Sequence, residues 1–265
     1  MKLNKDNIAD SDKELALNIR NHIVNGQFVI GNPGLGLKKT LMELENQRDS
    51  RVFSNTEWAM KDAILNARIA MTKAGIEGET SLCDYLSRLL KYDSRLRGIV
   101  AFASLSYEQE SNDKDYIPDT DTLLVFGHHV LIVDAKNLKT KPGHPIELMD
   151  GYIVDEKGKE IIPVHPSTHI WRRVLDKANV KLESIDGYVC VVNDNETSII
   201  RNEEWYSSHT KLIHISELHE ILLEWVQGKD NTFYLDILTE IAKSQIKEEK
   251  QLDLDIDAIK KKFGV

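Results

Sequence analysis

The first 75 residues carry apolar positions at the three- and four-residue spacing of amphipathic helices. Residues 11–24 (SDKELALNIRNHIV) and 54–74 (SNTEWAMKDAILNARIAMTKA) show this period. The second segment opens with Ser54 and Glu57, which have the spacing of a capping box. We therefore predict a helical N-terminal extension over residues 1–75.

From residue 78 the pattern changes to an alternation of helices and strongly apolar strands. Residues 78–93 (GETSLCDYLSRLLKYD) predict a helix that has Glu79 in its first turn. Strands are predicted at 97–109, 120–127, 128–137 and 185–194, and a second hairpin turning at EKGK is predicted at 146–164. Two more helices are predicted at 166–179 and 216–228. This order predicts an α/β (α+β) domain over residues 76–228, with a mixed central sheet flanked by helices, and a helical C-terminal tail over residues 229–265.

Length and composition add few constraints. The chain has 265 residues, so one substantial core can form without a staple, and its two cysteines lie in apolar segments typical of reduced core thiols. The N-terminus lacks an apolar leader region, and we expect a soluble cytoplasmic protein with no membrane contact. A formal charge of -9 argues against a general nucleic-acid coating protein.

A glycine-rich segment at residues 31–40 (GNPGLGLKKT) invites comparison with a phosphate-binding loop. A Walker A motif needs lysine directly after its last glycine, followed by serine or threonine. Here Leu37 and Lys38 stand before Lys39 and Thr40. The segment is better interpreted as a glycine-rich turn, and NTP binding remains the least favoured alternative.

The segment DTDTLLVFGHHVLIVDAKNLK, residues 119–139, carries the most informative chemistry. If the Gly127-His128 dipeptide forms a two-residue hairpin turn, Phe126 pairs with His129. Counting back along both strands sets Asp121 opposite Asp134. Lys136 then lies on the same face as Asp134, because side chains alternate along a strand.

This register predicts two carboxylates and one ammonium group at one end of a buried sheet. Like charges opposite each other are unfavourable, and unpaired charge at a buried position is costly. Lys136 compensates one carboxylate, and a hard cation such as Mg²⁺ or Mn²⁺ between Asp121 and Asp134 would account for the rest. The alternative is that the strand simply leaves the core there, since the same acid-x-lysine spacing occurs in a polar turn at Asp155 and Lys157.

The segments around these residues resemble the nuclease-related domain family of the PD-(D/E)XK nuclease superfamily. GETSLCDYL resembles its opening helix and places Glu79, TDTLLV places Asp121, and VLIVDAKN places the acid-x-lysine pair Asp134 and Lys136. HPSTHIW resembles its proline-initiated helix, with His169 where the family usually has glutamine. The acid of the acid-x-lysine motif is aspartate here instead of glutamate. The resemblance covers about residues 78–225 and implies a restriction-endonuclease-like core.

The resemblance also implies roles for these residues in a Mg²⁺-dependent DNA endonuclease. Asp121 and Asp134, with the Ala135 carbonyl, would hold Mg²⁺ or Mn²⁺, which activates a water against a phosphodiester. Lys136 would orient that water or neutralise charge on the phosphate, and Glu79 would support the metal or bind a second one. A function in defence or in mobile elements is one expectation; the site chemistry alone permits RNA as well as DNA.

Three further residues on the 166–179 helix are candidates for substrate binding or support. His169 occupies the glutamine position of the family, and Arg172 or Arg173 could contact a phosphate. The main alternative to an enzyme is a catalytically silent nuclease fold that binds nucleic acid or acts as a scaffold. In either case the helical ends are candidates for self-association or for binding a protein partner.

Overall fold

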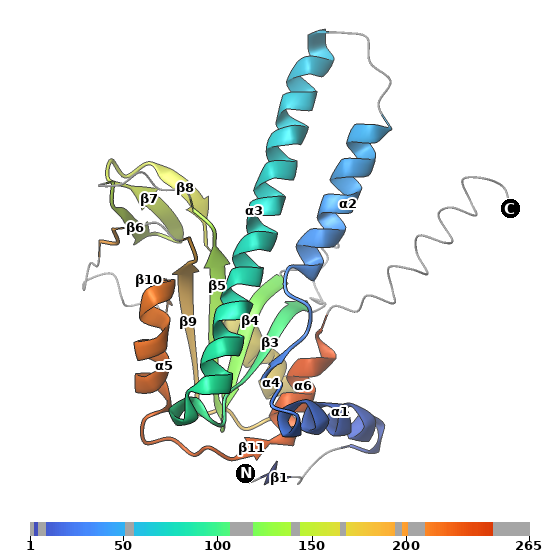
Figure 1. The fold of residues 1–265 in the computed structure, drawn as a ribbon, viewed down its shortest axis with the longest axis vertical. Helices are drawn as coiled ribbons and strands as arrows, with labels where there is room; N and C mark the ends of the chain where they lie inside the picture. Colours follow the sequence, from blue (N-terminus) through green and yellow to red (C-terminus); the bar gives the residue numbers. More distant parts are fainter. Residues whose placement is uncertain are drawn as a thin grey trace, which may run out of the picture.

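The computed structural model describes residues 3–4, 9–50, 56–106, 119–138, 144–164, 168–193, 198–200 and 210–245, and side chains are described except for residues 3–4 and 56–60 (Figure 1). A six-stranded mixed sheet lies at the centre. Its strand order is β10 (Thr210–His214), β9 (Ser184–Val191), β5 (His129–Lys136), β4 (Asp119–Phe126), β3 (Val100–Ser106) and β2 (Val29–Ile30). The strands β3, β4 and β5 are antiparallel, whereas β9, β10 and β2 each run parallel to their neighbours.

Helices cover both faces of this sheet. One face packs on α1 (Lys13–Val24), α4 (Thr168–Lys177) and α6 (Leu235–Lys243). The other packs on the C-terminal half of α3 (Thr56–Tyr92) and on α5 (Leu218–Val226). Because central strands such as β4 and β5 are buried on both faces, their sequences are nearly continuous apolar runs. The predicted mixed sheet flanked by helices is confirmed.

Two small sheets and three 3₁₀ turns complete the described fold. Strands β6 (Ile146–Met149), β7 (Tyr152–Asp155) and β8 (Glu160–Pro163) form an antiparallel sheet, and β1 (Leu3–Asn4) pairs with β11 (Phe233–Tyr234). The 3₁₀ turns are η1 (Asp10–Asp12), η2 (Ser94–Leu96) and η4 (Ile215–Glu217). In the described part of the chain, no helix has the length and apolar character that a membrane crossing needs.

The predicted helix boundary near residue 78 is wrong, because α3 runs without interruption from Thr56 to Tyr92. Two glycines of this helix permit close approach to neighbouring elements. A Cβ at Gly78 would lie 3.1 Å from the Asn137 Cβ at the end of β5, and one at Gly75 would lie 2.6 Å from the Leu37 Cδ1 of α2 (Leu35–Asp49). Glycine therefore lets a continuous helix pass close to both neighbours.

Segments near both ends of the described chain contribute to the core, whereas residues 246–265 of the predicted C-terminal tail lie outside the described residues. β2 extends the central sheet, Ile19 and Ile23 of α1 are buried in the main core, and so are Ile237 and Leu238 of α6. The hairpin predicted at 146–164 has an additional turn. Asp150 and Gly151 both have positive φ, 46° and 81°, and this tight turn divides the segment into three strands.

Candidate active site at one end of the central sheet

The hairpin between β4 and β5 has the predicted register. Gly127 has φ +60° at the first turn position, and the paired residues run from Phe126–His129 to Thr122–Val133. The next position holds Asp121 and Asp134, just beyond the last pair. There the Oδ2 atom of Asp121 accepts a hydrogen bond from the Ala135 backbone N–H at 2.7 Å. A side-chain bond thus connects the two strands where the paired residues end.

Lys136 and Asp134 form a close ion pair at the same end of the sheet. The Lys136 Nζ lies 2.6 Å from the Asp134 Oδ1, and the two side chains are only 19% and 17% exposed. Both residues belong to β5 and are two positions apart, so their side chains leave the strand on the same face. The sequence prediction that this lysine neutralises one carboxylate agrees with the structure.

Glu79 reaches the cluster from the middle of α3, not from a first helical turn as predicted. Its side chain is 7% exposed, and its Oε2 accepts a hydrogen bond from the Gly34 backbone N–H at 2.9 Å. Gly34 is the N-cap of α2 and has φ +72°. The Glu79 carboxylate therefore lies at the N-terminus of α2, where the partial positive charge of the helix favours an anion.

The structure adds Ser104 to this neighbourhood, a residue for which the sequence has no signal. Ser104 is buried within β3 and has φ +52°, unusual for a non-glycine residue. It falls between the pairs Ala103–Thr122 and Leu105–Thr120, so it lies across from Asp121. Its Oγ accepts a hydrogen bond from the Leu35 N–H at 3.2 Å. Two successive backbone N–H groups at the N-terminus of α2, those of Gly34 and Leu35, thus donate to Glu79 on α3 and to Ser104 on β3.

Burial and mutual repulsion raise the pKa of the clustered carboxyl groups. Burial raises the pKa of Glu79 to about 7, opposed by the Gly34 N–H and reinforced by Asp119 and Asp134. Burial, then Asp134 and Glu79, raise the pKa of Asp121 well above its usual range. The cluster therefore holds more potential negative charge than its surroundings can stabilise.

The same carboxylates also raise the pKa of Lys136, where a higher pKa favours the charged form. Burial lowers the pKa of Lys136, but Asp134 and Asp121 raise it more, so the net pKa lies above the usual value. At the rim, burial raises the pKa of Asp119 and the charge of Lys39 on α2 opposes it. Lys136 is consequently a permanent cation that faces more than one carboxylate.

The donor set has the chemistry that a hard divalent cation prefers, namely carboxylate oxygens from Glu79, Asp121 and Asp134. The present geometry is not a ready coordination sphere. Among the described residues, no three His, Cys, Asp or Glu side chains are grouped so that they could hold a metal ion. One oxygen of Asp134 is bonded to Lys136, and one of Asp121 to the Ala135 N–H. A cation would have to share or displace these contacts.

The residues predicted on the helix after the second hairpin lie on α4. His169, Arg172 and Arg173 are exposed, whereas Trp171 between them is fully buried. The Trp171 Nε1–H donates to the Thr120 Oγ1 at 2.9 Å, which ties α4 to β4 next to Asp121. The role of the three exposed side chains in substrate binding stays a prediction.

Two histidines near the second hairpin in sequence add no ligand to the cluster. His144 is exposed and pairs with Glu156 at 2.9 Å, and His165 lies outside the described residues.

Searches of protein-family models, curated proteins and solved structures found no match to this chain.

Proposed function

We propose that the chain is a metal-dependent nuclease that hydrolyses phosphodiester bonds of DNA at the Glu79, Asp121, Asp134 and Lys136 cluster. The observation that carries the proposal is the convergence of three acidic side chains and one lysine, from α3, β4 and β5, at one end of a buried sheet. Excess negative charge at a buried position is unfavourable unless a cation binds there. Mg²⁺ or Mn²⁺ is the cation that such oxygen ligands suit.

In this proposal each residue has a separate task. Asp121 and Asp134, with the Ala135 carbonyl, would hold the cation, and Glu79 would support it from α3. A metal held there would supply polarisation of the phosphodiester and a more acidic water. Lys136 stabilises negative charge that develops on the phosphate in the transition state. The exposed His169, Arg172 and Arg173 on α4 position the nucleic-acid backbone.

The element order supports a PD-(D/E)XK-like core within the mixed α/β fold. The elements follow one another in the order of the resemblance. The helix α3 carries an acid, and the antiparallel strands β3 to β5 carry Asp121 and the acid-x-lysine pair. The helix α4 and the strand β9, which is parallel to β5, come next. The resemblance to the nuclease-related domain family is thus compatible with this architecture. We also propose that the segments outside this order, residues 1–75 and the tail, are additions to the nuclease unit.

A catalytically silent nuclease fold that binds nucleic acid or a protein partner is the alternative. The observation in its favour is that the Lys136 ammonium already bonds to Asp134, while no three potential ligands among the described residues are grouped for a metal. In a silent module this lysine would serve as the permanent counter-ion. The two functions differ in whether Mg²⁺ binds at this cluster.

The decisive experiment is a cleavage assay on plasmid DNA and on RNA with Mg²⁺ or Mn²⁺. Lys136→Ala and Asp134→Ala should each lower the rate by at least about 100-fold, the size of effect known for removing a group that stabilises the transition state. Lys157→Ala is the matched control, because Lys157 has the same acid-x-lysine spacing but lies in an exposed turn. Wild-type cleavage that persists in both site variants would exclude the cluster as the active site.

A metal titration separates the enzyme from the silent module. Mg²⁺ should raise the thermal unfolding temperature of the wild type, since a ligand that binds only the folded chain stabilises it. The Asp121→Asn, Asp134→Asn double variant should show no such rise. An equal response in both proteins would leave the silent module as the better description.

A further inference from the structure

The C-terminal end of α3 and the turn η2 carry a local concentration of positive charge. Residues 88–97 contain four basic residues and one acid, a net charge of +3, in a chain whose formal charge is -9. The acid is Asp93, which is already bonded to Arg95 and to His219 of α5. The remaining three cations are all exposed, namely Arg88, Lys91 and Arg97. A surface of this sign attracts phosphate groups even though the whole chain is acidic.

An open hollow of about 620 Å³ lies on this part of the surface, and its described lining falls within residues 85–95. Arg95 of η2 is one of the lining residues. Four others form one stripe of α3, because they are spaced three or four residues apart: Tyr85, Arg88, Leu89 and Tyr92. Aromatic rings and guanidinium groups therefore line the same hollow. We use the term α3 patch for Tyr85, Arg88, Tyr92 and Arg95.

The two tyrosines of the α3 patch provide aromatic surface for a flat ligand. Tyr92 is 76% exposed, and the Lys91 Nζ lies 5.3 Å from the centre of its ring. Tyr85 is half-buried and packs against the core, which holds its ring in place. The two residues are seven positions apart, which is about 10.5 Å along the helix axis. Aromatic side chains beside positive charge are the surfaces on which the bases of single-stranded nucleic acid stack.

The two arginines of the α3 patch have N–H groups left for phosphate oxygens. The Arg95 Nε and Nη2 donate to the Asp93 carboxylate at 3.0 and 2.6 Å, and the His219 Nε2 lies 2.7 Å from the same carboxylate. These contacts orient the guanidinium, and among the described residues none accepts from its Nη1. The Arg88 Nε donates to the Asp84 backbone carbonyl at 3.3 Å, and Arg88 has no ion pair within the described part of the chain. Guanidinium N–H groups bind phosphate with well-defined geometry.

We propose that the α3 patch binds single-stranded DNA, with bases stacked on its two tyrosines and phosphates bonded to its two arginines. A single strand fits better than a duplex, because the bases of a duplex stack on each other and offer no free face to tyrosine. Glu79 is on the same helix, with Tyr85 about 9 Å and Tyr92 about 20 Å further along the axis. A strand held here can therefore reach the proposed active site. The choice of DNA rests on the proposed function, whereas binding needs neither metal nor cleavage.

The test measures the fluorescence anisotropy of a labelled oligodeoxythymidine of about 16 nucleotides, in EDTA so that no metal-dependent cleavage occurs. Tyr92→Ala should weaken binding at least about fivefold, the lower end of the loss expected for one stacked base. Tyr92→Phe keeps the ring and should bind like the wild type. Arg88→Ala should weaken binding and reduce the slope of log affinity against log salt by about 0.7, the share of one phosphate contact on a single strand.

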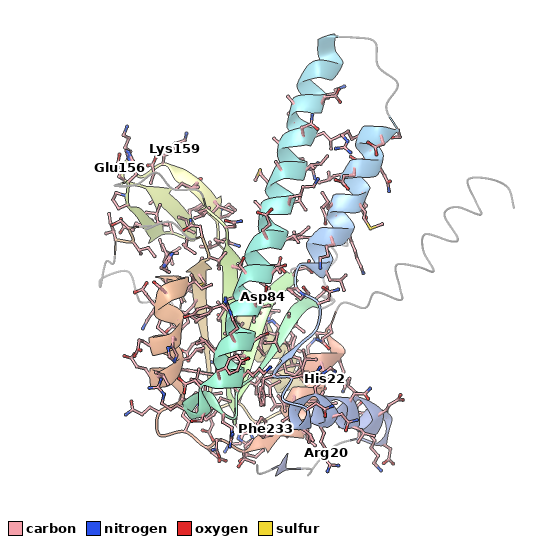
Figure 2. All side chains as sticks on the ribbon, in the orientation of Figure 1. Arg20, His22, Asp84, Glu156, Lys159 and Phe233 are labelled. Carbon is pink, nitrogen blue, oxygen red and sulfur yellow. The ribbon has the colours of Figure 1, made fainter. Side chains whose placement is uncertain are left out.

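Arg20→Ala is the matched control for the loss of a positive charge. Arg20 is also exposed, but it lies on α1, which packs on the other face of the sheet (Figure 2). This variant should bind the oligonucleotide like the wild type. An Arg20→Ala variant that loses as much affinity as Arg88→Ala would overturn the proposal, because binding would then follow net charge alone.

Other results would also overturn the proposal. These are a wild type that does not bind the oligonucleotide and a Tyr92→Ala variant that binds as tightly as the wild type. A duplex of the same length that binds equally well would refute base stacking. Polyglutamate that displaces the oligonucleotide at equal charge concentration would assign the α3 patch to acidic proteins, and an oligouridylate that binds more tightly would replace DNA by RNA.

This test is separable from the cleavage assay. A wild type that cleaves DNA with Mg²⁺ but shows no Tyr92-dependent binding in EDTA would overturn this inference and leave the nuclease proposal intact. Tyr92-dependent binding without any metal-dependent cleavage would support the α3 patch and count against the nuclease proposal alone.

Discussion

Replacing Glu79 with glutamine should make folding stability much less dependent on pH. Glu79 is 7% exposed, and burial together with neighbouring carboxylates raises its pKa from 4.5 to about 7. Glutamine keeps an oxygen that can accept the Gly34 N–H and removes the ionisable proton. The variant therefore changes the charge of the site with little change in shape.

The direction follows from comparing the folded and unfolded chains. Because the folded pKa is the higher one, the folded chain binds the proton more tightly. Protonation of Glu79 therefore stabilises the fold below about pH 4.5, and this stabilisation is lost as pH rises through about 7. The whole shift corresponds to roughly 3 kcal/mol, most of which falls between pH 5 and pH 8.

Urea denaturation at pH 5 and pH 8, without divalent metal, measures this effect. Relative to wild type, Glu79→Gln should gain roughly 2 to 3 kcal/mol in unfolding free energy on going from pH 5 to pH 8. Other carboxyl groups titrate in both proteins, so only the difference between the proteins counts. An unfolding free energy with the same pH dependence in both would show that Glu79 is not held near neutral pKa by burial.

Two further predictions test the local geometry. Gly34→Ala should lower the unfolding free energy by about 2 kcal/mol, because the new Cβ would sit at φ +72° and would also lie 3.3 Å from the Ile76 Cα. Gly26→Ala is the control and should lose only about 1 kcal/mol, because Gly26 has φ +73° but no atom within 4 Å of the new Cβ. Equal losses in urea denaturation would argue against the contact. Burial raises the pKa of Cys83 to about 11, and Cys190 is buried with a raised pKa too, so a thiol reagent at pH 8 should label neither cysteine until the chain is unfolded. Rapid labelling of the folded protein would contradict that burial.

The sequence was sufficient where one local rule decides the structure. The Gly127-His128 turn sets the register of β4 and β5, so the positions of Asp121, Asp134 and Lys136 followed from counting residues. The Asp150-Gly151 dipeptide carries an equally local turn signal, which was overlooked in favour of one longer hairpin. Both features depend on backbone conformations of adjacent residues.

The sequence was insufficient where glycine has two opposite meanings. The change of pattern at residue 78 predicts a new helix there, but α3 is continuous through Gly75 and Gly78. The physical reason is that the missing Cβ makes room for Leu37 on one side and for Asn137 on the other. Close approach to a distant segment cannot be distinguished from a helix end by a pattern along the chain.

By itself, then, the sequence determined strands β3, β4, β5 and β9, the hairpin between β4 and β5 and the charged residues at one end of it, but not the outer strands β2 and β10, because periodicity and turn chemistry act between near neighbours. Only the tertiary structure placed the N-terminus of α2 against this cluster. The Gly34–Glu79 bond joins residues 45 positions apart, and the Leu35–Ser104 bond joins residues 69 positions apart. Such contacts exist only after the helices have packed on the sheet, since they depend on where two distant backbones meet.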